Sequence, residues 1–123
     1  MIGDMARGKR MLNLFCYTAA ASVHAALGGA TSSLSIDMSN SYLEWAGRNF
    51  ALNGMDPNQH QLLRADCLEW LEREQGVFDL VFLDPPTFSN SKKMEQVLDI
   101  QRDHGALIGH AMAVLAPGGT LVF

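Results

Sequence analysis

The chain has 123 residues, of which 48% are hydrophobic and 18% charged, and its formal net charge is −4. This composition fits one folded globular domain and excludes a disordered chain. No apolar run approaches the roughly 20 residues of a membrane helix, and two cysteines are too few for a disulfide framework or a zinc site. Because the N-terminus carries no signal peptide, we expect a cytoplasmic protein with no metal and no membrane partner. Its acidic balance makes the chain alone no obvious RNA binder.

Short β-prone runs alternate with helical patterns along the chain. We predict strands at Arg10–Phe15, Thr31–Asp37, Gln61–Ala65, Phe78–Leu83 and Thr120–Phe123. We predict helices at Thr18–Leu27, from Ser39 or Ser41 to Leu52, at Cys67–Glu74 and at Met94–Leu115, with a turn at Pro117–Gly119. Such alternation gives parallel strands with helices on both faces of the sheet. The sequence therefore predicts an α/β fold with a doubly wound, mostly parallel sheet, in one domain over residues 1–123.

The last predicted strand reaches the end of the chain at Phe123. Because a folded domain rarely stops on a bare strand, we expect a fragment of a longer protein, truncated after its fifth strand. An open edge strand also favours pairing with a second copy of the chain, as a homodimer.

Polar residues stand at the carboxyl ends of four of the predicted strands. They are the segment Asn13–Ala19 and the three acids Asp37, Asp66 and Asp84. The carboxyl ends of parallel strands form the ligand-binding edge of an open α/β sheet. The first loop lacks the G-x-G-x-x-G pattern that binds a pyrophosphate, which argues against NAD or FAD. A nucleoside ligand without phosphates, such as S-adenosylmethionine, fits this loop better.

Asp37 is the candidate ribose ligand, because its two oxygens are able to accept from both the 2′ and 3′ hydroxyls. The alternative is that it caps the following helix, but nearby serines already supply a cap. Asp66 is placed to accept a hydrogen bond from the adenine amino group, and the Cys67 backbone N–H is placed to donate to a ring nitrogen. Both roles are compatible with the alternative that Asp66 is a plain helix cap. Met38 either lies against the adenine face or belongs to the core.

The motif Asp84-Pro85-Pro86-Thr87 is the most specific in the chain. An acid and two prolines after the fourth strand, followed by an aromatic residue, are typical of methyltransferases that act on nitrogen. The acid and a proline carbonyl accept hydrogen bonds from an amino group, and the aromatic ring stacks on a base. Thr87 occupies the aromatic position here. Phe88 follows it and either stacks on a flipped base or packs against the next helix.

Several segments together resemble one family. They are LNLFCYTAAASVHAALGGA, IDMSNSYLEWAGRNFALNG, RADCLEWL, FDLVFLDPPTFSNSK and QRDH. They are similar to the RlmK domain of the bacterial RlmK/L-type bifunctional 23S ribosomal RNA guanine methyltransferases. The resemblance implies a Rossmann-like class I methyltransferase fold, S-adenosyl-L-methionine as methyl donor, and N7 of a guanine in 23S ribosomal RNA as acceptor.

The same resemblance assigns roles to particular residues. It implies a cofactor loop that contains Phe15, Tyr17 and Ala19 and lies beside Asn13. It also implies a ribose acid at Asp37, an adenine acid at Asp66, and a catalytic loop at Asp84–Phe88. The family usually has glycine where this chain has Ala19, so we expect Ala19 either to crowd the ligand or to have a negative φ. Because the strands that normally follow are missing, this chain alone is expected to be a weak catalyst. A different acceptor, such as a protein glutamine, and a non-catalytic fragment are the alternatives.

Overall fold

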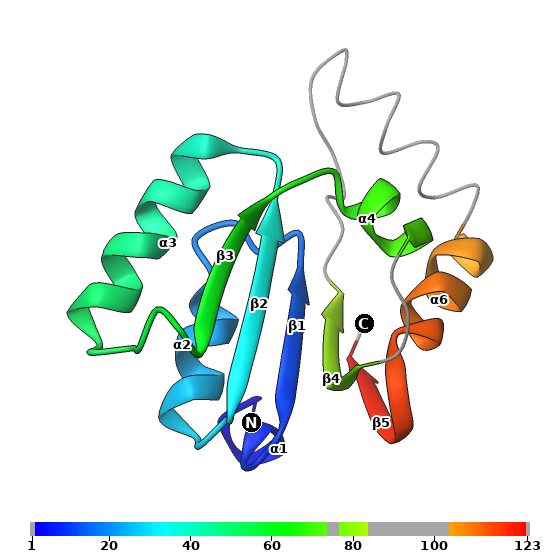
Figure 1. Ribbon diagram of the computed structural model, residues 1–123, viewed down its shortest axis with the longest axis horizontal. Helices are drawn as coiled ribbons and strands as arrows, with labels where there is room; N and C mark the ends of the chain where they lie inside the picture. The colour runs from blue at the N-terminus through cyan, green and yellow to red at the C-terminus, as the bar shows by residue number, and fades with distance from the viewer. Residues whose placement is uncertain (1, 74–76, 84–103, 123) are drawn as a thin grey trace.

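The computed structural model of the chain describes residues 2–73, 77–83 and 104–122 (Figure 1). Its strands are β1 (Arg10–Leu14), β2 (Ser32–Asp37), β3 (His60–Arg64), β4 (Phe78–Leu83) and β5 (Leu115–Val122). Its helices are α1 (Ile2–Ala6), α2 (Ala20–Leu27), α3 (Asn40–Leu52), α4 (Cys67–Arg73) and α6 (His104–Ala113). The strands form one sheet in the order β3-β2-β1-β4-β5, and every pair is parallel. The predicted α/β fold is confirmed.

The sheet is covered on both faces, as a doubly wound sheet requires (Figure 1). Side chains of β1 alternate between the two faces. Leu12 and Leu14 pack with residues of α4 and α6, whereas Met11 packs with residues of α1 and α2. All three are fully buried. β1 therefore lies at the centre of the molecule, with apolar layers on either side of it.

The structure differs from the predicted elements in two places. Helix α1 was not expected from the sequence. β5 begins at Leu115 rather than Thr120, because residues on both sides of the predicted turn pair with β4: Phe78 pairs with Leu115 and Leu80 with Thr120. The turn survives as an irregularity within the strand, where Gly118 has a φ of +80°. The predicted helix start at Met94 lies outside the described residues.

The amino ends of β1 and β4 are joined by a bidentate ion pair. The Asp79 carboxylate accepts hydrogen bonds from Nε and Nη2 of Arg10, at 3.0 and 3.1 Å, and from the Arg10 backbone N–H at 3.0 Å. These hydrogen bonds lower the pKa of Asp79 to about 2. The pair is partly exposed to solvent, so it contributes little to stability. Its main effect is to fix the position of β4 relative to β1.

Within the described part of the chain, no helix is both long and apolar enough to cross a membrane.

Candidate functional site

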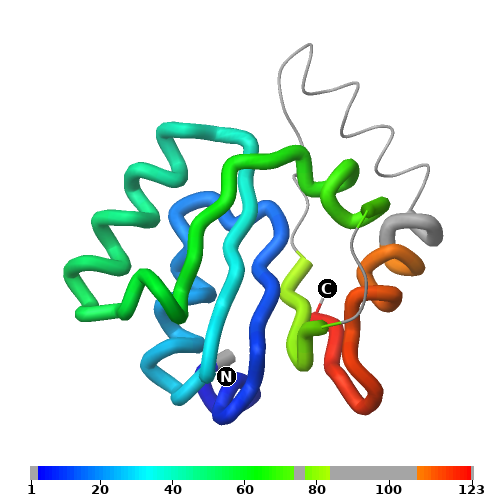
Figure 2. Tube along the Cα trace, in the orientation of Figure 1, coloured from blue at the N-terminus to red at the C-terminus, as the bar shows by residue number. Residues whose placement is uncertain are grey.

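The carboxyl ends of β1, β2, β3 and β4 meet at one edge of the sheet (Figure 2). At this edge Leu14 of β1 pairs with Leu83 of β4 and with Ile36 of β2. The strand order reverses between β1 and β4, and such a switch point is where open α/β sheets bind ligands. The loop that begins at Phe15 leaves the sheet at this point. The acceptor residues Asp84, Pro85, Pro86 and Phe88 follow Leu83 in the sequence and lie outside the described residues.

The loop between β1 and α2 has an unusual backbone. Phe15, Tyr17 and Ala19 have φ angles of 57°, 53° and 61°, which place three non-glycine residues in the left-handed region. Each such residue costs on the order of 1 kcal/mol or more and persists only where surrounding contacts enforce it. Clustered backbone strain of this kind is typical of ligand-binding loops. Phe15–Ala19 is called the cofactor loop below.

Three backbone N–H groups fasten the cofactor loop to neighbouring segments. The Phe15 N–H donates to Cys67 Sγ at 3.3 Å, and the Cys16 N–H donates to the Ile36 carbonyl at 3.0 Å. The Tyr17 N–H donates to Asp37 Oδ2 at 3.0 Å. The loop is thus held by β2 and by the first residue of α4. These contacts hold the loop against Asp37 and Cys67, at the sheet edge where the sequence analysis expected a ligand site.

Asp37 is a buried carboxylate with both oxygens engaged. Its side chain is 8% exposed, and Oδ1 accepts from the Ser39 N–H at 2.9 Å while Oδ2 accepts from Tyr17. Ser39 itself caps α3, because its Oγ accepts from the Tyr42 N–H at 3.3 Å. A serine therefore supplies the helix cap, and it is Ser39 rather than Ser41. Each Asp37 oxygen keeps a second lone pair for a hydroxyl donor, so the ribose role stays a prediction that this geometry permits.

Met38 is exposed rather than part of the core. Its exposed fraction is 54%, so the core alternative was wrong. Its carbonyl accepts from Arg64 Nε at 3.0 Å, which ties the end of β3 to the segment after β2. An exposed thioether next to Asp37 is available to a flat apolar ligand, as the adenine prediction requires.

Asp66 caps α4, since its Oδ1 accepts from the N–H groups of Leu68 at 2.9 Å and Glu69 at 3.3 Å. Cys67 is the first residue of α4, so its own N–H has no acceptor within the helix. The carboxylate and that N–H stand at the end of β3, beside β2, because the Ala65 N–H donates to the Asp37 carbonyl at 3.1 Å. The adenine roles of Asp66 and Cys67 stay predictions.

Asn13 has a structural partner that the sequence did not reveal. Its side chain is 1% exposed, and Nδ2 donates to Ser22 Oγ at 2.9 Å. Ser22 Oγ lies 2.6 Å from Ser35 Oγ, so the three residues link β1, α2 and β2 in one buried polar chain. This chain fixes α2 on the sheet directly after the cofactor loop. The prediction that Asn13 also contacts the cofactor remains untested.

Both cysteine thiols are buried, as the sequence analysis favoured. Burial raises the pKa of Cys16 and of Cys67 to about 12, so neither thiol forms a nucleophilic thiolate near neutral pH. The ordinary value is 9.0, and the unfolded chain would therefore ionise its thiols first as the pH rises. We predict that the folded state loses stability above about pH 9.

A thiol reagent at pH 8 checks the same burial. The folded chain is expected to leave both cysteines unmodified, and denaturant should expose both at once. Rapid labelling of Cys67 in the folded chain would contradict the buried position that holds Phe15.

Ala19 stands where the resembled family has glycine, and its φ of 61° is positive. The alternative of a negative φ was therefore wrong, and crowding of the ligand by the Ala19 methyl group stays a prediction. Ala19 is fully buried and packs with Cys16, Ala46 and Phe50. Burial of its methyl group contributes about 0.8 kcal/mol, and glycine would add about 0.5–1 kcal/mol of chain entropy to the cost of folding. In a glycine variant, the relief of backbone strain would offset these two losses, because the three contributions are of similar size.

We therefore predict that Ala19→Gly changes the free energy of unfolding by less than about 1 kcal/mol. Ala19→Val should destabilise the fold by at least about 2 kcal/mol, because a β-branched residue fits neither the φ angle nor the packed cluster. Denaturant unfolding of the two variants measures both effects. A stabilisation well above 2 kcal/mol in Ala19→Gly would show that the strain is not compensated.

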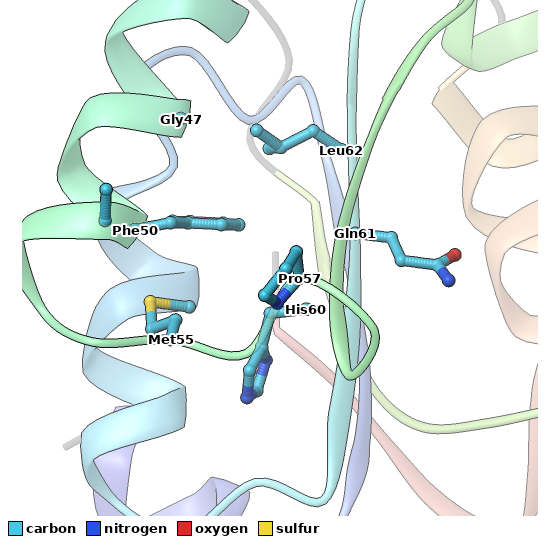
Figure 3. A pocket seen from close by; sticks show the side chains of 8 residues that line it. Gly47, Phe50, Met55, Pro57, His60, Gln61 and Leu62 are labelled. Atoms are coloured by element: carbon cyan, nitrogen blue, oxygen red, sulfur yellow. The ribbon is translucent and has the colours of Figure 1, made fainter.

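A cavity lies away from this edge of the sheet. It has a volume of about 500 Å³ and lies between the carboxyl-terminal half of α3 and the amino end of β3 (Figure 3). Its lining residues are Gly47, Phe50, Ala51, Met55, Pro57, His60, Gln61 and Leu62. No predicted site residue lines it, so the cavity is separate from the carboxyl edge of the sheet. Across the ranges that the structure covers, no group of three metal-ligating side chains is found.

A strained loop, a buried acid and a capped helix start meet at the switch point of a parallel sheet. This arrangement suits a nucleoside that lacks phosphates, since the loop carries no glycine-rich cradle and the edge presents carboxylates. The fold and the site define a Rossmann-like nucleoside-binding domain.

Comparison with known proteins shows which family of nucleoside-binding domains this chain belongs to. The family model described as S-adenosylmethionine-dependent methyltransferase matches residues 1–123. The chain belongs to this family. A ribosomal RNA large subunit methyltransferase K/L from Chromohalobacter salexigens is 67% identical over 98% of this chain and 16% of its own length. Its counterpart from Marinomonas sp. is 64% identical over 100% of this chain and 17% of its own length.

A solved structure agrees with both relatives. A methyltransferase crystallised in complex with SAH superposes with a TM-score of 0.84 at 31% identity, over 98% of this chain and 32% of that one. The resemblance inferred from the sequence motifs is thereby confirmed. The chain spans about a sixth of the length of the curated relatives that it matches.

Proposed function

We propose that this chain is the domain that transfers a methyl group from S-adenosylmethionine to N7 of a guanine in 23S ribosomal RNA. The observation that carries the proposal is the match of the whole chain, at 64–67% identity, to relatives named as large-subunit ribosomal RNA methyltransferases. We propose further that residues 1–123 belong to one S-adenosylmethionine-dependent methyltransferase domain of a longer cytoplasmic enzyme.

The donor side is assigned to the residues gathered around β1 and β2. The cofactor loop would lie along the amino acid part of the ligand and Asp37 would accept from the ribose. Met38, Asp66 and Cys67 would surround the adenine. Support comes from their adjacency: Tyr17 donates to Asp37, and Phe15 donates to Cys67. One set of hydrogen bonds therefore couples all of the proposed donor-binding segments.

The acceptor side is assigned to Asp84, Pro85, Pro86 and Phe88. S-adenosylmethionine supplies an electrophilic methyl group on a sulfonium sulfur, so an acceptor atom needs only a lone pair aligned with it. Guanine N7 has that lone pair and carries no proton to lose. A general base is then unnecessary, and positioning carries most of the catalysis. Asp84 would orient the guanine by accepting hydrogen bonds, and it would not remove a proton.

A protein acceptor is the main alternative, because the acid-proline-proline motif also serves transfer to amide nitrogen. A competition assay separates the two acceptor classes. The chain is incubated with tritiated S-adenosylmethionine and a mixture of 23S RNA and ribosomal proteins. Both the RNA and the proteins come from cells that lack the modification. We expect label in the RNA fraction only, and label confined to the protein fraction would overturn the proposal.

We also propose self-association through β5, the edge strand beside β4. An unpaired strand edge is a template for another chain. Sedimentation at rising protein concentration should show a dimer, because the outer edge of β5 is open to a second copy. A monomer at all concentrations would contradict this assignment.

A further inference from the structure

Exposed side chains of α3, together with one residue before it and one at the end of β3, form a surface that contains two aromatic rings and two arginines. Met38, Tyr42 and Trp45 have exposed fractions of 54%, 41% and 55%. Arg48, one turn beyond Trp45, and Arg64, at the end of β3, are also exposed. These five residues are called the α3 aromatic surface below. Large aromatic rings are seldom left in water on a helix without a use, because burying them is strongly favourable.

This surface begins at the cofactor loop. The Tyr42 ring meets the ring of Tyr17 edge-on, with centroids 5.6 Å apart and planes at 82°. α3 starts at the carboxyl end of β2, level with the edge that carries the proposed site (Figure 1). The α3 aromatic surface is therefore continuous with the methyl-transfer site rather than on a remote face.

Two arginines give the surface a positive charge. The Arg48 guanidinium lies 5.5 Å from the centroid of the Trp45 ring, and Arg64 Nε donates to the Met38 carbonyl. Glu44 is the single carboxylate between residues 38 and 48. The five residues of the surface carry two guanidinium groups and no carboxylate, and the acids Asp37 and Asp66 stand beside it in sequence, next to Met38 and two residues after Arg64. The partner that this charge fits is an anion with flat apolar groups.

We propose that the α3 aromatic surface binds single-stranded RNA, with bases stacked on Tyr42 and Trp45 and phosphates paired with Arg48 and Arg64. Single-stranded nucleic acid is commonly held by aromatic platforms interleaved with cations. The inference rests on the proposed function, since it names the surface that receives the nucleotides next to the methylated guanine. It explains how an acidic chain obtains local affinity for RNA.

Trp45 is itself the reporter for a direct test. The chain has two tryptophans, and the other, Trp70, packs against Phe78. In a Trp70→Phe background, unlabelled RNA oligonucleotides are titrated while Trp45 fluorescence is followed. Single-stranded RNA is expected to quench this fluorescence by stacking, whereas a duplex of equal length should quench it far less.

Affinity measurements on variants complete the test. Trp45→Ala should weaken single-stranded RNA binding by about 5- to 150-fold, the range for loss of one stacked base, and Trp45→Phe should retain most of the affinity. Arg48→Gln should reduce the slope of log affinity against log salt by about 0.7. The matched control is Leu52→Ala on the same helix, where Leu52 is 84% exposed and outside the surface. It should bind RNA like the parent chain.

Three results would overturn the inference. One is unquenched Trp45 fluorescence together with equal RNA affinity in Trp45→Ala and Leu52→Ala. Another is a concentration-dependent dimer that Trp45→Ala abolishes, which would make the surface a contact between copies of the chain. The third is an equal loss of S-adenosylhomocysteine binding in Trp45→Ala, because the residue would then serve the donor side. If RNA quenched Trp45 fluorescence but methyl groups were transferred only to protein, the proposed function would be rejected. The inference that the α3 aromatic surface binds RNA would then still stand.

Discussion

Asp37→Ala is expected to weaken the binding of S-adenosylmethionine by about 100-fold, equivalent to about 2.8 kcal/mol. The carboxylate receives the Tyr17 and Ser39 N–H groups from two different segments. Its loss leaves both donors without their acceptor and releases the cofactor loop from β2. The proposed ribose contacts are lost at the same time. Isothermal titration calorimetry measures the change, and unchanged affinity would remove Asp37 from the donor site.

Asp56→Ala is the matched control for this variant. Asp56 is an exposed acid whose Oδ1 accepts from the Asn58 N–H at 2.9 Å in the loop before β3. Its replacement also removes one charge and one backbone contact, but it lies outside the proposed site, so ligand affinity should stay within about twofold. An analogue of S-adenosylhomocysteine without ribose hydroxyls separates the two roles of Asp37. If Asp37 only holds the loop, the parent chain would bind that analogue as well as the normal ligand.

Asp84→Ala is expected to lower the rate of methyl transfer by at least about 100-fold while it leaves S-adenosylmethionine affinity nearly unchanged. A misplaced acceptor loses about this factor when positioning carries the catalysis. The residue follows Leu83, which pairs with Leu14 immediately before the cofactor loop. Single-turnover methyl transfer and calorimetry, measured on the same preparation, report the two properties separately.

Asp84→Asn distinguishes an orienting acid from a base. An amide oxygen still accepts a hydrogen bond but cannot take a proton at neutral pH, so this variant should keep most of the rate. The rate of the parent chain should also be flat between about pH 6 and 8. Two results together would show that Asp84 acts as a base and that the acceptor loses a proton. They are an asparagine variant as inactive as the alanine variant, and a methyl-transfer rate of the parent chain that rises with pH.

Much of the fold was predictable because the periodic signals were strong. The apolar run of β4, the acid after β2 and the alternation of elements predicted a parallel sheet with its site at one edge. Helix α1 and the early start of β5 were missed for physical reasons. A five-residue helix has little periodicity, and the glycines that predicted a turn near Gly118 instead allow a strand to bulge.

The contacts that support the proposed site residues were not visible in the sequence. Asp37 and Asp66 were chosen as ligands, and both also hold backbone N–H groups of their neighbours. The Cys67 thiol that receives the Phe15 N–H could not have been found, because that contact joins residues far apart in sequence. The positive φ at Ala19 was missed because alanine normally indicates an ordinary backbone. The glycine that the resembled family has at this position was the signal for it.

Mapping of the transferred methyl group tests the central claim most directly. The chain is incubated with tritiated S-adenosylmethionine and 23S ribosomal RNA that lacks the modification, and the labelled nucleotide is isolated and identified by mass spectrometry. The account predicts label on guanine as the N7-methyl product, at one site, lost in Asp84→Ala and retained in Leu52→Ala. Label on another base, on a guanine atom other than N7, or on none of the RNA would contradict it.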